Sequence, residues 1–305
     1  MVSFVSSGNE AIRYTTSFRK NLAGAESNTA IGLAKLGKKV SWISKLGEDE
    51  FGAYILRELR AENVDVSHVT SSASHPTGIM FKQQVSQEAT SVFYYRAGSA
   101  ASTLTSADLP LEEIRKAKIL YLTGITPALS SNCRALIFEL IDFAKKEELL
   151  IAFDPNIRLK LWSKDEAKIC LNQIMAKSDL VFIGDEEAKL LLGTGEPQEI
   201  AQLLFERGVK KVAIKLGGKG AFVADETGGH FVHALKTTVV DSIGAGDAFN
   251  AGFIYGLLEG VGLEECGRIG SILGAKAVSV KGDVEGLPEL KQLQNILHQN
   301  NEIYR

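Results

Sequence analysis

The sequence predicts an α/β protein, with a mostly parallel central sheet flanked by helices. Two observations predict this class. From about residue 118 onward, short apolar runs alternate with stretches whose apolar residues recur at helical spacing. The apolar runs are continuous, as in strands that are buried on both faces of a parallel sheet. Alternation of strands and helices of this kind places helices over both faces of the sheet.

The expected elements follow one another in a regular order. Strands are expected at 119–122, 149–153, 180–183 and 212–215. Helices are expected between them at 133–146, 187–192 and 199–207. Ligands of such sheets bind outside the carboxyl ends of the strands. The 305 residues contain no internal repeat, low-complexity tract or obvious linker, so we expect a single domain over residues 1–305.

Two regions break this alternation. Residues 77–97 alternate polar and apolar side chains around a polar centre, which predicts an antiparallel pair of strands with one wet face. The pair is either a plain extension of the sheet or a lid over a substrate, formed by about residues 75–101 with part of the N-terminal segment. Residues 220–234 predict a β-hairpin that turns near residues 227–229.

Composition and charge exclude several classes of function. The formal net charge of -3 argues against a surface for nucleic acid or for anionic membranes. The three cysteines, Cys133, Cys170 and Cys266, are far apart and are expected to be buried thiols in a reducing compartment. No apolar run approaches the length of a membrane helix, and the first residues lack the pattern of a signal peptide. We therefore expect a cytoplasmic protein that binds neither nucleic acid nor membrane.

The most informative segment is residues 241–249, DSIGAGDAF. Apolar residues at helical spacing follow it, so a helix is expected to start around Ala245. Gly244 and Gly246 allow close approach of the backbone at that start. Unpaired N–H groups at a helix N-terminus form an anion site, and fixed donors of this kind stabilise a phosphoryl group in transfer. Gly244, Ala245 and Gly246 are therefore expected to be part of a catalytic site.

Asp247 lies in the same first turn, where its carboxylate can accept the proton of an attacking hydroxyl. The alternative is an aspartate that only complements the helix dipole. The Gly-Ala-Gly that precedes Asp247 favours the catalytic base. The segment is not a phosphate-binding P-loop, because no G-x-x-x-x-G-K-[ST] occurs, and Phe249 stands where a dinucleotide fingerprint has its third glycine.

The segment DSIGAGDAF resembles the C-terminal signature of the PfkB (ribokinase-like) carbohydrate kinases, D-[TS]-x-G-A-G-D-x-F. A second block resembles the N-terminal signature of the same family, at 24–30 (GAESNTA), 36–37 (LG) and 45–52 (KLGEDEFG). The resemblance covers essentially the whole chain. It implies a ribokinase-like three-layer fold with a small β lid, and transfer of the γ-phosphoryl group of ATP to a sugar hydroxymethyl group.

Three stretches resemble the members of that family that phosphorylate the 6-hydroxyl of 2-keto-3-deoxygluconate, a sugar acid: 93–102, 123–130 and 154–162. A guanidinium recognises a carboxylate through two parallel hydrogen bonds, which suits Arg96 and Arg158 to an acid substrate. Arg96 could instead be a surface arginine. By the same resemblance, Arg158 contacts either the carboxylate or the nucleotide, and it is less diagnostic of an acid substrate because related fructokinases share its surroundings. The resemblance implies substrate contacts from Gly24, Ala25, Glu26, Ser27, Asn28, Met80, Tyr94, Arg96, Arg158 and Asp247.

Residues 215–220, KLGGKG, resemble the nucleotide loop of the family. The nucleotide contacts that the resemblance implies are Asn156, Arg158, Lys215, Gly217, Gly218, Gly220, Gly244 and Gly246. Mg²⁺ accompanies ATP in this chemistry. Whether the reaction also uses a monovalent cation stays open. Glu187 matches the glutamate of the family's N-x-x-E motif, which helps to position magnesium and phosphate. Gly184 stands where that motif usually has asparagine, and Met80 where sugar-acid kinases often have tyrosine.

Residues 1–4, MVSF, resemble the segment just after the first strand of the family. Loss of that central strand would expose backbone groups and apolar surface beside it, so we expect either a start that is too late or a rearranged, poorly active form. Three functions stay open: a sugar-acid kinase, a fructokinase or other hexose kinase, and a non-catalytic sugar- or nucleotide-binding homologue. The exposed edge of the lid also favours a homo-oligomer.

Overall fold

The computed structural model describes residues 1–8, 10–84 and 90–303. Its central sheet has six strands in the order β12-β11-β10-β9-β8-β7. The first four along the chain are parallel, and the last two form an antiparallel hairpin. The mostly parallel sheet and the hairpin near residue 227 are therefore confirmed. These strands are β7 (Ile119–Thr123), β8 (Leu150–Asp154), β9 (Leu180–Gly184), β10 (Lys211–Lys215), β11 (Ala221–Asp225) and β12 (Gly228–Val232).

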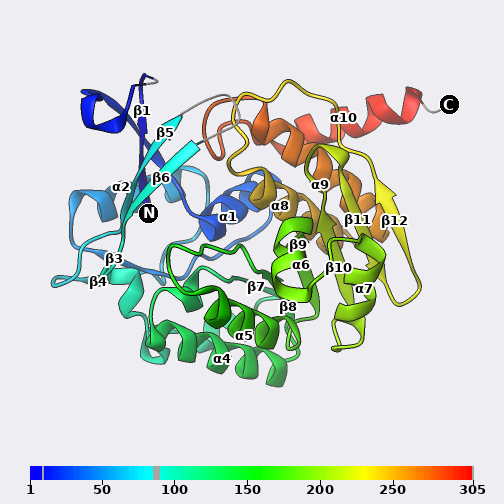
Figure 1. Cartoon of the computed structure of the whole chain (residues 1–305), viewed down its shortest axis with the longest axis horizontal. Helices are drawn as coiled ribbons and strands as arrows, with labels where there is room; N and C mark the ends of the chain where they lie inside the picture. The colour runs from blue at the N-terminus through cyan, green and yellow to red at the C-terminus, as the bar shows by residue number, and fades with distance from the viewer. Residues whose placement is uncertain (9, 85–89, 304–305) are drawn as a thin grey trace.

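Helices cover both faces of this sheet (Figure 1). One face packs against α1 (Ala25–Lys35), α8 (Ala245–Glu259) and α9 (Leu263–Val278) in a first apolar core. The other face packs in a second core against α4 (Ser131–Lys146), α5 (Lys164–Met175), α6 (Asp185–Leu192) and α7 (Pro197–Phe205). The three-layer expectation is confirmed, and the three cysteines are buried free thiols.

Local sequence explains where several of these helices begin. Ser130 caps α4 by accepting a hydrogen bond from the backbone N–H of Cys133, at 3.1 Å. Ser163 and Glu166 form a capping box at the start of α5. The remaining elements are α2 (Glu50–Ala61), α3 (Leu111–Ile114), α10 (Leu290–Ile303) and the short parallel pair β3 (Lys45–Gly47) and β4 (Thr70–Ser72). No helix within the described ranges is long and apolar enough to cross a membrane.

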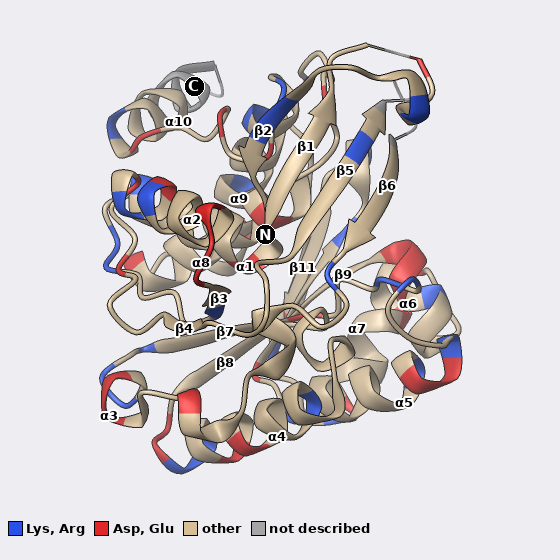
Figure 2. Cartoon of the chain, turned by 90° about the vertical axis from the view of Figure 1, so that its left-hand side faces the viewer, with Lys and Arg blue, Asp and Glu red and all other residues tan. Residues whose placement is uncertain are grey.

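A second sheet of four strands stands over the carboxyl edge of the central sheet (Figure 2). Its order is β2-β1-β5-β6, with β1 parallel to β5 and the other pairs antiparallel. The antiparallel pair expected in 77–97 is confirmed, while its turn at 85–89 lies outside the described residues. The strands are β1 (Val2–Ser6), β2 (Phe18–Leu22), β5 (Ile79–Gln84) and β6 (Thr90–Tyr95).

The first residues of the chain thus belong to the second sheet, and β7 forms one edge of the central sheet. Residues 38–44 lie outside the helices and strands of the described chain, and Ser41 forms an isolated bridge with Asp65. The β7 edge borders the large cavity that is described next.

Candidate active site

The glycine turn before α8 has the conformation that its sequence predicts. Gly244 has a φ of +82°, and a side chain there would meet the backbone oxygen of Asp283 at 2.5 Å, so only glycine fits. The helix begins at Ala245, as expected. Asp247 follows in the first turn and is only 9% exposed. The backbone N–H groups of this turn and the Asp247 carboxylate therefore lie at one helix tip.

Two amide side chains hold the Asp247 carboxylate. Asn28, on α1, donates from Nδ2 to Asp247 Oδ2 at 2.8 Å, and Asn156 donates to Oδ1 at 3.5 Å. Burial raises the pKa of Asp247 to about 7, and the negative charge of Asp154 acts in the same direction. The hydrogen bond from Asn28 and the charge of Lys215 oppose this rise. A carboxylate with a pKa near neutrality suits proton transfer at physiological pH.

A second buried carboxylate lies behind Asp247. Asp154 is fully buried and accepts hydrogen bonds from Lys215 Nζ at 2.8 Å and from Asn250 Nδ2 at 2.6 Å. Asn250 also donates to the hydroxyl of Tyr121 at 2.9 Å. The sequence analysis named Lys215 but missed the other three residues. Asp154 had a usable signal, because it stands at the carboxyl end of an apolar run.

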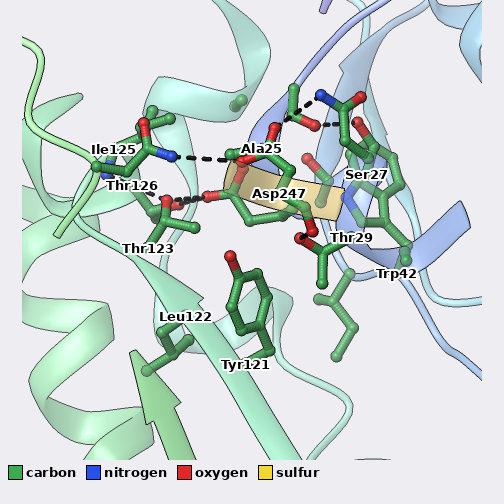
Figure 3. Close-up of a pocket in the computed structure, with 18 of the residues that line it drawn as sticks. Ala25, Ser27, Thr29, Trp42, Tyr121, Leu122, Thr123, Ile125, Thr126 and Asp247 are labelled. Carbon is green, nitrogen blue, oxygen red and sulfur yellow. Dashed lines mark hydrogen bonds between the residues drawn. The ribbon is translucent and has the colours of Figure 1, made fainter. Parts of the chain in front are cut away.

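The substrate residues that the sequence analysis named line one cavity of about 1460 Å³. Figure 3 shows Asp247 within it, with Ala25 and Ser27 of α1 nearby and Thr123 and Thr126 across from them. Glu26 fixes this wall by accepting hydrogen bonds from the Thr123 hydroxyl at 2.6 Å and the Thr126 hydroxyl at 3.2 Å. The full set is Gly24, Ala25, Glu26, Ser27, Asn28, Met80, Tyr94, Arg96, Arg158 and Asp247.

Arg96 presents a positive charge to this cavity. Its guanidinium lies 5.8 Å from the centre of the Tyr94 ring, and its buried Nε has no hydrogen-bond partner among the described residues. Burial lowers the pKa of Arg96, the charges of Glu26 and Tyr94 raise it, and the positive charge of Arg158 lowers it further. Two arginines at one cavity, one of them with an unsatisfied buried donor, fit an anionic ligand such as a carboxylate.

A buried ion pair joins the second sheet to the residues around Asp247. Lys82, on β5, and Asp283 are 2.7 Å apart, with side chains only 4% and 6% exposed. Asp283 also accepts a hydrogen bond of 3.4 Å from Asn28, which holds Asp247. Both residues line the cavity, and the sequence analysis missed both. No local pattern could reveal them, because they are 201 residues apart.

Three of the glycines proposed for nucleotide binding, Gly217, Gly218 and Gly220, lie in the turn between β10 and β11, while Gly244 and Gly246 lie at the start of α8. Gly217 and Gly218 have open space where a side chain would stand. Gly220 differs, because a side chain there would lie 2.0 Å from the backbone oxygen of Val232, so packing against β12 requires this glycine. Lys215 ends β10 and reaches toward the first turn of α8, where a side chain on Gly246 would lie 3.5 Å from its Nζ.

The Glu187 side chain links two segments of backbone by hydrogen bonds. Its carboxylate accepts the N–H groups of Ile157 at 2.8 Å and Gly184 at 3.1 Å, which closes the start of α6. Burial raises its pKa, as does the charge of Asp154. No group of three or more His, Cys, Asp or Glu residues within the described ranges could hold a metal. Magnesium needs few protein ligands when phosphates and water complete its shell, so Glu187 fits an indirect contact.

Known proteins resemble the chain over its full length. It is 37% identical to the 2-dehydro-3-deoxygluconokinase of Bacillus subtilis (strain 168), over 100% of this chain and 95% of the relative. It is 30% identical to the 5-dehydro-2-deoxygluconokinase of Geobacillus kaustophilus (strain HTA426), over 94% of this chain and 87% of that protein.

Solved structures share the fold as well. A sugar kinase from Pyrococcus horikoshii, in complex with ATP, superposes with a TM-score of 0.84 at 28% identity, covering 97% of this chain and 95% of that one. The family model described as pfkB family carbohydrate kinase matches residues 2–290. The chain therefore belongs to the PfkB family of carbohydrate kinases.

Proposed function

We propose that this kinase transfers the γ-phosphoryl group of ATP to the 6-hydroxyl of 2-keto-3-deoxygluconate. One observation carries the proposal: a carboxylate with a pKa of about 7 lies at a helix N-terminus, in the same cavity as Arg96 and Arg158. The first group suits the removal of a proton from an alcohol, and the arginines suit the carboxylate of a sugar acid.

In the proposed reaction, Asp247 accepts the proton of the sugar hydroxyl as its oxygen attacks the γ-phosphorus. A new oxygen–phosphorus bond forms while the bond to the leaving ADP breaks, and the proton leaves Asp247 for solvent after the products depart. The backbone N–H groups of 244–246 donate to the oxygens of the group in transfer. Mg²⁺ bound with ATP would offset phosphate charge, and Glu187 would help to place it.

The four-stranded sheet suits the role of a lid. It carries Met80, Tyr94 and Arg96 to one side of the cavity, and Lys82 ties it to Asp283. We propose that the chain acts as one domain with this lid, and that the outer edges of β2 and β6 pair two copies in solution. A cytoplasmic location accords with the three free thiols. Omission of K⁺ from the assay tests for a monovalent-cation requirement.

An ADP-release panel tests the substrate, with 2-keto-3-deoxygluconate, 5-keto-2-deoxygluconate, 2-ketogluconate, fructose and ribose at one protein concentration. We expect the highest kcat/KM for 2-keto-3-deoxygluconate. Arg96→Ala should lower kcat/KM for this acid by about tenfold to a hundredfold, the contribution of a charged hydrogen bond, and should affect fructose far less. Arg57→Ala is the matched control, since Arg57 is exposed on α2 and pairs with Glu58.

Two results would contradict the proposal. A higher kcat/KM for fructose would assign a neutral hexose, and equal losses for both sugars in Arg96→Ala would remove Arg96 from recognition of the acid. Ligand-dependent shifts in melting temperature without ADP release would favour a non-catalytic sugar-binding protein.

A further inference from the structure

The buried ion pair of Lys82 and Asp283 lies between the second sheet and the glycine turn before α8. The two side chains are only 4% and 6% exposed, and their charged atoms are 2.7 Å apart. Neither side chain takes part in the transfer step proposed above. Replacement of such a pair by apolar side chains of similar size is often neutral or stabilising, so stability alone does not account for its presence.

Asp283 is held from two sides. On the side of α8, a side chain on Gly244 would lie 2.5 Å from the backbone oxygen of Asp283, so the two backbones are in close contact. On the side of the second sheet, Lys82 reaches Asp283 from β5, and Asn21 of β2 donates from Nδ2 to Glu285 Oε1 at 3.4 Å. Two strands of the second sheet are thus joined to the turn at which α8 begins.

One amide links this ion pair to the proposed base. Nδ2 of Asn28 donates to Asp247 Oδ2 at 2.8 Å and to Asp283 Oδ2 at 3.4 Å. Because a single nitrogen reaches both oxygens, the two carboxylates cannot lie farther apart than these two distances together. Oδ1 of Asn28 is buried and has no partner in the described part of the chain, because the amide turns its donor group toward two acceptors.

The charge of the pair matters because other ionisable groups surround the base. Those that interact with Asp247 come from several elements: Asp154 of β8, Lys215 of β10, Tyr121 of β7, and Asp283. Burial and the negative charges of Asp154 and Asp283 raise the pKa of Asp247, whereas the positive charge of Lys215 lowers it. Lys82 offsets the charge of Asp283, so the intact pair acts on Asp247 far less than Asp283 alone would.

We propose that Lys82 and Asp283 are positioning residues for the transfer step: the pair orients the amide that holds Asp247 and limits the negative charge beside it. The Lys82 ammonium holds the carboxylate of Asp283, and this carboxylate shares the Asn28 amide with the proton acceptor. The inference rests on the proposed role of Asp247 as that acceptor. The pair acts in this way without touching the sugar or the nucleotide.

Removal of one charge at a time should move the titration of Asp247 in opposite directions. Lys82→Met leaves the negative charge of Asp283 uncompensated, which should raise the pKa of Asp247 by at least about one pH unit. Asp283→Asn leaves the Lys82 ammonium uncompensated, which should lower that pKa by a similar amount. The double variant Lys82→Met/Asp283→Asn removes both charges, and Lys82→Arg keeps both. Each of these should hold the pKa within about half a pH unit of its original value.

Two readouts are recorded for each variant. Carboxyl-carbon NMR of protein labelled with ¹³C-aspartate follows the titration of Asp247 directly, and its signal is assigned by its loss in Asp247→Asn. The pH dependence of kcat/KM for 2-keto-3-deoxygluconate follows the same group in turnover. Shifts of the two single variants in opposite directions, in both readouts, are the expected result. Shifts in the same direction, or an unshifted NMR titration, would overturn the proposal.

The two readouts also separate this proposal from the proposed function. An NMR titration that shifts as expected, with a kcat/KM that is flat with pH in the original protein, would refute Asp247 as the proton acceptor and the positioning role with it. A kcat/KM profile that inflects, together with an NMR titration that no variant shifts, would refute the positioning pair alone.

Lys35→Met is the matched control. Lys35 ends α1, about 10 Å along the helix from Asn28, and it pairs with Glu62 at 3.2 Å and Glu289 at 3.3 Å. Its replacement removes a lysine ion pair without changing the charges beside Asp247, so both readouts should match those of the original protein. A shift in this control equal to that of Lys82→Met would attribute the effect to general destabilisation and overturn the proposal.

The comparison does not depend on the folding of Lys82→Met. If that variant does not fold, Asp283→Asn is compared with the double variant. The pKa of Asp247 should be lower in Asp283→Asn by at least about one pH unit, because only this variant retains an unpaired ammonium. Equal values would overturn the proposal.

A final arm tests direct contact between Lys82 and the substrate, since Lys82 lines the cavity. The KM values for 2-keto-3-deoxygluconate and for fructose are measured in the double variant, and both should change by a similar factor. A KM that rises at least about tenfold for the acid alone, with an unshifted titration of Asp247, would assign Lys82 to the substrate carboxylate and overturn the positioning role.

Discussion

Replacement of Asp247 by asparagine removes the negative charge of the side chain and nearly preserves its shape. The amide oxygen of the new side chain can keep the hydrogen bond from Asn28 at 2.8 Å. Asn156 can turn its amide to accept the new N–H₂ group, because its own Oδ1 has no partner in the described part of the chain. We therefore expect Asp247→Asn to fold in the same way and to bind ATP nearly as well as the original protein.

The size of the stability effect follows from the pKa. Burial raises the pKa of Asp247 from 3.8 to about 7, and each unit corresponds to about 1.4 kcal/mol. Because the pKa is higher in the folded state, the folded chain binds this proton more tightly than the unfolded chain does. The protein consequently loses stability as pH rises between these two values, up to about 4 kcal/mol in all. The asparagine variant lacks this loss.

Urea unfolding at pH 5, 6, 7 and 8 measures the difference. The quantity to follow is the free energy of unfolding of Asp247→Asn minus that of the original protein. This difference should increase by about 3 kcal/mol between pH 5 and pH 8, and nearly all of the increase should occur below pH 7. The turnover of the variant at pH 8 should fall at least about a hundredfold. Asp165→Asn, on the exposed start of α5, is the charge control. A difference that does not change with pH, or near-normal turnover, would refute the reasoning.

Three further predictions follow from the same site. The value of kcat/KM should increase with pH and level off above an inflection near 7, because the base must be ionised in the free enzyme; a flat pH–rate profile would contradict this. Lys82→Met leaves Asp283 buried and unpaired, so urea unfolding should show a loss of about 3–5 kcal/mol, while Lys82→Arg should retain most of the stability. Gly244→Ala adds a side chain 2.5 Å from the Asp283 backbone oxygen at a φ of +82°, so it should cost more than about 1 kcal/mol and lower turnover, whereas an unchanged melting temperature would disprove the steric argument.

The parts of the fold that sequence could predict are those encoded by neighbouring residues. Continuous apolar runs predicted β7 to β10, because strands buried on both faces leave a local signal. The turn before α8 was predicted because Gly244 and Gly246 act within a few residues of Asp247. These short-range relations needed no knowledge of how the chain packs.

The supporting residues of the site could not be predicted in this way. Asp154 meets Lys215 across 61 residues and Asn250 across 96. Lys82, within an alternating strand, resembles any solvated lysine until Asp283 is placed beside it. Gly220 is an example of the opposite kind. The sequence analysis assigned it to a nucleotide loop, but the structure shows that glycine is required there because the backbone packs closely against β12. Long-range packing decided each of these outcomes.

The bond between Asn28 and Asp247 joins residues 219 positions apart, and β1 pairs with β5 across more than seventy residues. The surroundings of Asp247 therefore form only when the segments around residues 28 and 247 have come together. Contacts of such long range close slowly, after local helices and hairpins. On dilution from denaturant, circular dichroism should recover before catalysis does. A nascent chain still on the ribosome would acquire most of its helices well before it could turn over a sugar.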